Sequence, residues 1–392
     1  MKLPHNVLSV MQKLDTAGYE VFAVGGCVRD ALLGKTPKDF DLTTSATPEE
    51  IKRVFPRTVD TGIKHGTVTV LYKGGAFEIT TYRIDGEYTD NRRPENVTFS
   101  LELREDLRRR DFTVNALAYH PKTSYVDYYG GIADLRAKIL RGVGDPAARF
   151  TEDGLRMLRA VRFCAQLGFE IEPATLSAIR EKAYLLKNIS AERVHIEFTK
   201  IIESPHPEVF ALLCGTKLLK YFSENLQIYL EKNLDNIIQN LTRVKNLAAF
   251  FMYSEKPEVF LKEFKSSKKI RITTCMLCKN VNMKLPETPA ETRQYLSKFG
   301  VSNLRDILIF KSGILKEDIT DALVMIETIL SRKECFTIET LAVNGADLAT
   351  VGVHGIDTGR ALSYLLSRVI ENPRYNNKNK LLDLVFEFRC RK

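Results

Sequence analysis

Residues 25–41, with the sequence GGCVRDALLGKTPKDFD, constrain the fold of this chain more than any other stretch. The apolar residues 21–24 before them predict a strand that ends at two glycines, Gly25 and Gly26. Glycines there let the backbone approach a ligand closely, and the first turn of the next helix offers unpaired N–H groups to a phosphate. We therefore expect a strand, a glycine turn and a short helix from Cys27 that together bind phosphate.

Two aspartates, Asp39 and Asp41, stand one residue apart at the end of this stretch. If residues 39–42 form a strand, both carboxylates lie on one face, and Phe40 and Leu42 lie on the other. Carboxylates this close repel each other unless a cation lies between them. Mg²⁺ is held by one or two carboxylates and keeps positions open for substrate phosphates. The pair therefore predicts a magnesium-dependent nucleotide site.

The composition limits the class of protein. The chain has 392 residues, of which 44% are hydrophobic, so it is long enough for two or more packed units. Its formal net charge of +9 favours a polyanionic partner such as nucleic acid, although a solvated lysine-rich surface would give the same charge. The seven cysteines are scattered and odd in number, as in a reducing cytoplasm. No apolar run reaches the length of about 18 residues that a membrane-spanning helix needs, so we expect a cytoplasmic protein without membrane contact.

The residues that follow the aspartates predict more strands. The alternating runs 67–71 and 77–82 flank a glycine turn and should pair as a hairpin beside the aspartate strand. Glu78 lies on the second run, where it is either a third carboxylate near a metal or, as we expect, an exposed strand residue. Residues 85–104 have no clear period and predict a long loop, and loops of that length tend to be functional.

Several arginines are candidates for phosphate binding. Arg29 follows the double glycine by one turn, which favours a triphosphate ligand over an ordinary surface charge. Arg108, Arg109 and Arg110 stand in a row directly before Asp111. A carboxylate in that position is expected to hold at least one of them in place, as a phosphate-binding arginine requires.

Helical periods dominate past residue 140. In residues 152–162, Arg156, Arg159 and Arg162 recur every three residues after Asp153, which predicts one ridge along a helix. An exposed intrahelical pair of Asp153 with Arg156 would contribute only about 0.5 kcal/mol. The alternative is that the ridge lines the nucleotide site.

Four motifs in this order resemble those of a known family: the double glycine with DFD, then RRDFTVNA, EDGLRMLRAVRF and LAVNGADL. The sequence is similar to the bacterial class II CCA-adding enzymes (tRNA nucleotidyltransferases) and their poly(A) polymerase relatives. The resemblance is dense over residues 18–202 and returns at 341–372. No His-Asp pair occurs in the second half, which indicates the short form without a metal-dependent phosphohydrolase domain.

The resemblance implies an α+β fold in which a small mixed β-sheet nucleotidyltransferase head precedes all-helical neck, body and tail domains. The head would be residues 1–140 and the neck, which recognises the base, residues 141–204. The body, residues 205–290, and the tail, residues 291–392, would bind the acceptor stem and upper half of tRNA.

The resemblance also implies roles for individual residues. Asp39 and Asp41 would be the catalytic carboxylates and hold two Mg²⁺. The triphosphate would contact Gly26, Arg29 and Arg110. The incoming base would be read by Asp153 and Arg156, with further nucleotide contacts from Arg159 and Arg162.

The implied reaction is the addition of CCA to the 3′ end of tRNA from CTP and ATP without a template. The tRNA 3′-hydroxyl would attack the α-phosphate and release pyrophosphate. Cytosine and adenine both present an amino donor beside a ring-nitrogen acceptor, which a carboxylate and a guanidinium can match. Uracil and guanine reverse that pattern. Residues 85–94 favour full CCA addition, and A addition alone, poly(A) synthesis or a catalytically silent RNA-binding protein are the alternatives.

Overall fold

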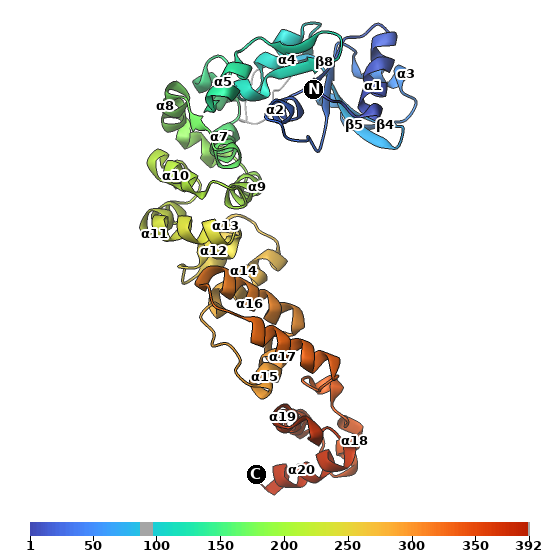
Figure 1. Ribbon diagram of the computed structural model, residues 1–392, viewed down its shortest axis with the longest axis vertical. Coiled ribbons are helices and arrows are strands. Elements are labelled where there is room, and N and C mark those ends of the chain that lie inside the picture. The colour runs from blue at the N-terminus through green and yellow to red at the C-terminus, as the bar shows by residue number, and fades with distance from the viewer. Residues whose placement is uncertain (87–96, 391–392) are drawn as a thin grey trace. The chain divides into compact units, whose positions relative to one another are not determined.

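The computed structural model describes residues 1–86 and 97–390 (Figure 1). The chain divides into two compact units, Met1–Ser267 and Lys268–Lys392. Within the described residues, no helix is both long enough and apolar enough to cross a membrane. The division into head, neck, body and tail stays a prediction.

The first unit begins with a mixed seven-stranded sheet in the order β3-β4-β5-β2-β1-β8-β9. Strands β2 and β5 pair in parallel and the other neighbours are antiparallel. The strands are β1 (Val21–Val24), β2 (Asp41–Thr44), β3 (Thr58–Gly62), β4 (Thr67–Tyr72), β5 (Gly75–Thr81), β8 (Leu117–His120) and β9 (Ser124–Asp127). The helices that accompany the sheet are α1 (His5–Thr16), α2 (Gly26–Leu32), α3 (Pro48–Val54), α4 (Leu103–Arg108) and α5 (Gly131–Ala137).

The β4–β5 hairpin confirms the prediction from the alternating runs, and β5 lies directly beside β2.

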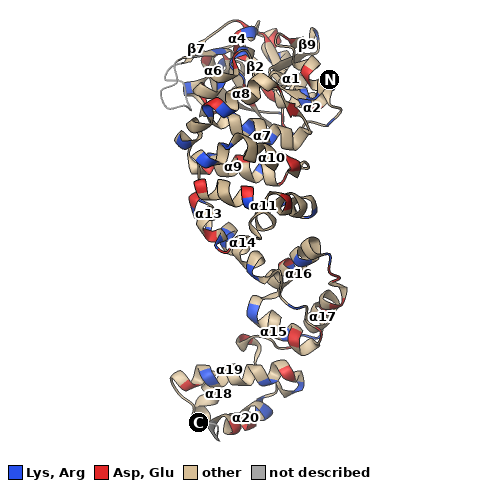
Figure 2. Ribbon diagram, turned by 90° about the vertical axis from the view of Figure 1, so that its left-hand side faces the viewer, with Lys and Arg blue, Asp and Glu red and all other residues tan. Residues whose placement is uncertain are grey.

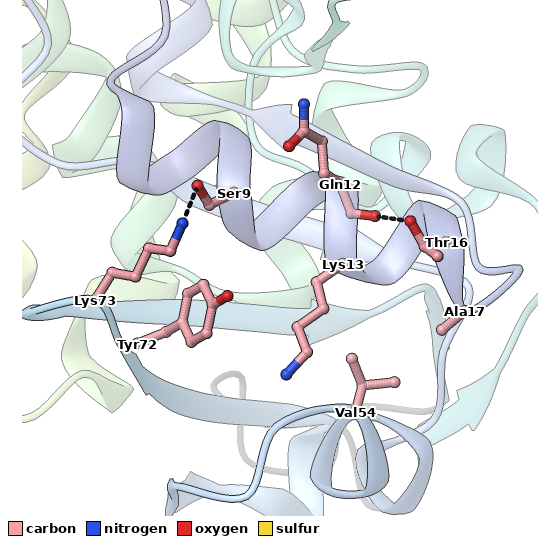
Figure 3. A pocket seen from close by; sticks show the side chains of 8 residues that line it. All are labelled: Ser9, Gln12, Lys13, Thr16, Ala17, Val54, Tyr72 and Lys73. Atoms are coloured by element: carbon pink, nitrogen blue, oxygen red, sulfur yellow. Dashed lines mark hydrogen bonds between the residues drawn. The ribbon is translucent and has the colours of Figure 1, made fainter.

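Helices α1 and α3 pack close to one another beside β4. The ammonium group of Lys13 lies 5.1 Å from the ring centre of Phe55 and 5.3 Å from that of Tyr72. Lys73 donates to Ser9 of α1, and Ser9, Lys13, Tyr72 and Lys73 line a shallow pocket (Figure 3). The aromatic rings thus hold Lys13 in place.

Two predictions about the head were wrong in part. Strand β2 begins at Asp41, so Asp39 lies in the preceding loop and the alternation of a strand does not align the two carboxylates. The segment 85–104 is not a loop throughout, because β6 (Arg83–Asp85) pairs with β7 (Val97–Phe99) and α4 begins at Leu103. Residues 87–96, which are half of the predicted loop, lie outside the described residues.

Helices complete the first unit. A short parallel pair of strands, β10 (Ile139–Leu140) and β11 (Glu170–Ile171), lies among them. The helices are α6 (Pro146–Glu152), α7 (Leu155–Leu167), α8 (Pro173–Lys182), α9 (Ala191–Ile202), α10 (Phe210–Thr216), α11 (Glu224–Arg243), α12 (Leu247–Phe251) and α13 (Pro257–Glu263). Aromatic packing joins several of them, because Phe198 on α9 contacts the rings of Phe210, Phe250 and Phe264.

The second unit is helical in its described residues and has two apolar cores. One core joins α15, α16 and α17, and the other joins α18, α19 and α20. The helices are α14 (Lys268–Asn280), α15 (Pro289–Phe299), α16 (Val301–Leu315), α17 (Thr320–Ser331), α18 (Gly345–Thr350), α19 (Ile356–Glu371) and α20 (Lys378–Cys390). A buried arginine, Arg293 on α15, links them, since it donates to Ile370 O at 2.8 Å and to Glu334 at 2.7 Å.

We predict that Arg293→Met destabilises the second unit by about 3 kcal/mol, because it leaves a carboxylate and a carbonyl without their buried donor. Thermal unfolding followed by calorimetry measures the change. The control is Arg305→Met, which removes an exposed ion pair with Glu327 and should cost no more than about 1 kcal/mol. Equal losses in the two variants would contradict the structural role of Arg293.

Candidate active site

A pocket of about 430 Å³ lies between the β1–α2 turn and the start of α7. Arginines and aspartates from the head and from the helices that follow it face one another across this pocket. The lining residues are Gly25, Gly26, Arg29, Asp41, Arg109, Arg110, Asp111, Asn115, Asp153, Leu155, Arg156, Arg159, Phe163 and Arg193. The structure therefore brings together all the predicted site residues except Asp39 and Arg162.

The glycine turn makes room for an arginine. Gly25 has a φ of 73°, and a Cβ at this position would lie 2.9 Å from Nη1 of Arg110. The guanidinium of Arg110 therefore rests against the backbone where α2 begins. A side chain at residue 25 requires this guanidinium to shift.

The carboxylate that holds the arginine row is Asp106, not Asp111 as the sequence predicted. Asp106 is fully buried and accepts from Arg109 at 2.7 and 3.0 Å and from Arg110 at 3.3 Å. Burial raises the pKa of Asp106, but the two guanidinium groups outweigh burial and leave its pKa below the usual value. Asp106 stands on α4, one helical turn before the arginines, and so holds their side chains from the head itself.

Asp111 instead joins the head to α7. Its Oδ2 accepts from Arg159 at 2.6 and 2.8 Å, and its Oδ1 accepts from the amide of Asn115 at 3.0 Å. Asn115 in turn accepts from Arg29 at 2.7 Å. Burial raises the pKa of Asp111, but Arg159 and Asn115 lower it to about 2. A continuous chain of charge-assisted hydrogen bonds thus connects the arginine on α2 with α7.

Of the two predicted metal-binding carboxylates, Asp41 lines this pocket and Asp39 does not. Asp41 also lines a neighbouring cavity of about 560 Å³, together with Asp39 and Glu78. The register that pairs Leu42 with Ile79 places Asp41 beside Glu78 on adjacent strands. Loss of hydration raises the pKa of Asp41, Arg110 lowers it and Asp39 raises it.

These carboxylates fit a divalent cation. Oxygen ligands from two aspartates suit Mg²⁺, which leaves other positions for substrate oxygens. Within the described ranges, no three acidic, histidine or cysteine side chains are close enough to form a complete metal site by themselves. Oxygens of the substrate would therefore complete the coordination.

Asp153 does not belong to the ridge of charged side chains that the sequence predicts along α7. Asp153 precedes the helix, and it pairs with Arg193 of α9 at 2.7 Å instead of with Arg156. Arg156 donates to Glu152 at 2.6 Å and to two backbone oxygens, that of Arg149 at 3.1 Å and that of Arg109 at 2.9 Å. Both side chains are therefore fixed before any nucleotide binds.

Arg162 lies on α7 but outside the pocket. It is buried and donates to Glu197 of α9 at 2.5 Å and to Gln166 at 2.9 Å. Its predicted contact with the nucleotide stays a prediction, and its contacts in the structure serve helix packing.

Three residues that shape the site, Asp106, Asn115 and Arg193, were not among the site residues predicted from the sequence. Asn115 belongs to the RRDFTVNA motif, so the motif itself held the signal. Arg193 lies 40 residues after Asp153 on a separate helix, and no local pattern links the two.

Two models of known protein families match parts of the chain. A family model described as "Poly A polymerase head domain" matches residues 21–141, and one described as "Probable RNA and SrmB- binding site of polymerase A" matches residues 168–229. The fold and the pocket thus define a nucleotidyltransferase with a polymerase-type head.

Relatives of nearly the same length show which family of nucleotidyltransferases this chain belongs to. The CCA-adding enzyme of Limosilactobacillus fermentum is 37% identical over 383 residues, which cover 95% of this chain and 94% of that protein. The CCA-adding enzyme of Streptococcus mutans is 37% identical over 405 residues, with 98% and 99% covered. The crystal structure of the Bacillus stearothermophilus CCA-adding enzyme in complex with CTP matches with a TM-score of 0.81 and 30% identity, over 100% of this chain and 99% of that one. The chain belongs to the family of CCA-adding enzymes.

Family membership confirms the resemblance and the α+β fold class inferred from the sequence. The chain is a nucleotidyltransferase that acts in tRNA processing, and enzymes of this kind generally use divalent metals.

We predict that Gly25→Ala lowers kcat/KM for nucleotide addition at least about tenfold, since its Cβ displaces Arg110 from the position that we expect for the triphosphate. Steady-state incorporation of CTP measures this effect. The matched control is Gly34→Ala, because Gly34 also has a positive φ, 71°, but no atom within 4 Å of the added Cβ. An equal loss of activity in the two variants would indicate that backbone strain, and not displacement of Arg110, lowers the activity, and full activity of Gly25→Ala would contradict the role of Arg110.

Proposed function

We propose that this chain adds C, C and A in turn to the 3′ end of tRNA, with CTP and ATP as substrates and no template. The observation that carries the proposal is a single pocket in which Asp41 of the head lies together with Asp153 and Arg156. Transfer and base choice then occur in the same place, and one bound nucleotide can satisfy both.

The hydrogen bonds of Asp153 support a base-reading role. Its Oδ1 accepts from the backbone N–H of Leu155 at 3.0 Å and from Arg193 at 3.3 Å, and its Oδ2 accepts from Arg193 at 2.7 Å. Each carboxylate oxygen carries two lone pairs. Oδ2 thus keeps one acceptor position, which suits the amino group of cytosine or adenine.

Arg156 complements this acceptor. Nη1 donates to Arg149 O and Glu152, and Nη2 donates once to Arg109 O. One Nη2–H and the Nε–H have no partner among the described residues, and either can donate to the ring nitrogen of cytosine or adenine. Uracil and guanine place a carbonyl against Asp153 and an N–H against Arg156, at a cost of about 1–3 kcal/mol per unsatisfied partner.

The residues of the head would hold the reacting groups. Gly26, Arg29 and Arg110 surround the position expected for the triphosphate, and Arg159 lies beside them. Asp39 and Asp41 would hold Mg²⁺, which when bound would activate the 3′-hydroxyl and neutralise charge on the leaving pyrophosphate. Glu78 is an exposed residue of β5, as the sequence predicted, and we assign it no role as a metal ligand.

The rest of the chain would bind tRNA. Lys and Arg residues occur on helices of both units (Figure 2), and cations of this kind bind the phosphates of a nucleic acid. We assign this role to residues 205–290 and 291–392, and we place the enzyme in the cytoplasm, where its substrates occur.

Asp153→Ala tests base reading. We predict that this variant loses at least about tenfold of its preference for CTP over UTP, because no acceptor remains for the amino group. Incorporation into tRNA without its 3′ end, measured with each of the four nucleotides, gives the preference. A variant that keeps the wild-type preference while its overall rate falls would contradict the role.

A substrate panel separates CCA addition from the alternatives. Transcripts of one tRNA that end in the discriminator base, in C or in CC are incubated with CTP, ATP or both. We predict products that end in CCA from all three transcripts. Product from the CC-ended transcript alone would indicate A addition, long adenosine tails would indicate poly(A) synthesis, and product formation unaffected by Asp41→Asn would contradict the proposed carboxylate site.

A further inference from the structure

We propose that Arg193 is a positioning residue that fixes the carboxylate of Asp153 and thereby determines the preference for C and A over U and G. This inference rests on the proposed base-reading role of Asp153. Arg193 belongs to α9, whereas the base-reading residues flank the start of α7. Base choice would therefore depend on a second helix.

The contact between Arg193 and Asp153 has a defined geometry. Nη2 lies 2.7 Å from Oδ2 and Nη1 lies 3.3 Å from Oδ1, so the guanidinium engages both carboxylate oxygens. Planar pairs of this kind fix orientation as well as distance. Both side chains are mostly shielded from solvent, so screening weakens the pair less than it would weaken an exposed one.

Asp153 needs this support because of its backbone. It lies between α6 and α7 in an extended conformation, with φ −142° and ψ 103°. Apart from Arg193, its carboxylate has one contact in the described structure, the N–H of Leu155 on Oδ1. Oδ2, the oxygen with the remaining acceptor position, is held by Arg193 alone. Without Arg193 the carboxylate can rotate about that single anchor, and the direction of the remaining lone pair is lost.

Helix α9 contacts α7 through a second ion pair that provides a control. The two helices lie side by side (Figure 1). Glu197 follows Arg193 by one turn, so both lie on the same face of α9. Glu197 pairs with Arg162, which does not line the pocket. Removing Glu197 therefore disturbs the same helix interface without touching Asp153.

The experiment compares single-turnover incorporation of CTP and UTP into tRNA by the full-length enzyme. The variants are Arg193→Met, Arg193→Lys, Asp153→Ala, the double variant of Arg193→Met with Asp153→Ala, and Glu197→Gln. Thermal unfolding of each variant reports whether it is folded.

We expect Arg193→Met to lower the CTP-over-UTP ratio about tenfold or more, and to do so without a matching fall in the rate with UTP. Arg193→Lys keeps the positive charge but cannot donate to both carboxylate oxygens through a planar guanidinium. This variant should therefore retain part of the CTP-over-UTP ratio. The double variant should match Asp153→Ala, because Arg193 acts through that carboxylate. Glu197→Gln should lower the unfolding temperature and leave the ratio unchanged.

Two results would overturn the inference. One is an equal fall in CTP and UTP rates in Arg193→Met, which would indicate a role in packing or in substrate binding. The other is an additive loss in the double variant, which would mean that Arg193 acts independently of Asp153. If Asp153→Ala itself left the ratio unchanged, the base-reading proposal would fail first, and the two failures are therefore distinguishable.

Discussion

The partly buried ion pair between Asp111 and Arg159 is the interaction on which the site depends. Asp111 belongs to the head and Arg159 to α7, so the pair sets where α7 lies against the head. Burial by itself disfavours the charge of Asp111, and the guanidinium of Arg159 and the amide of Asn115 compensate for that cost. The same carboxylate reaches Arg29 through Asn115. Arg29, which we propose binds phosphate, and α7, whose first turn we propose reads the base, are thereby positioned by one carboxylate.

A second contact, between Arg156 and Arg109, also connects α7 with the head. Arg156 donates to the backbone oxygen of Arg109, whose side chain is held by Asp106. The guanidinium of Arg156 thus takes its position from the head as well as from neighbouring residues. In the proposed role, Arg156 would not need to change its contacts before a base binds. One rigid pair of Asp153 and Arg156 would accept both C and A, since those two bases present the same pair of groups.

Local features of the fold were predictable from the sequence, and long-range partners were not. The β4–β5 hairpin and the β1–turn–α2 unit follow from alternation and glycines within a few residues. Strand β2 begins later than expected, because alternation alone does not mark where hydrogen bonding starts. The partners of the charged residues depend on contacts between distant segments. Sequence adjacency suggested Asp111 for the arginine row and Arg156 for Asp153, whereas packing selects Asp106 and Arg193. The residues implied by the family resemblance lie mostly in one pocket, but Arg162 faces α9 instead.

In the proposed enzyme, one nucleotide is held by the head through its triphosphate and by the helices that follow through its base. A crystal structure of this chain with CTP and Mg²⁺ would show whether this is so. We predict that the cytosine amino group donates to Asp153 while Arg193 stays on the same carboxylate, that Arg156 donates to the ring nitrogen, and that the triphosphate contacts Arg29 and Arg110. A triphosphate bound at the glycine turn with its base directed away from Asp153 and Arg156 would contradict this account.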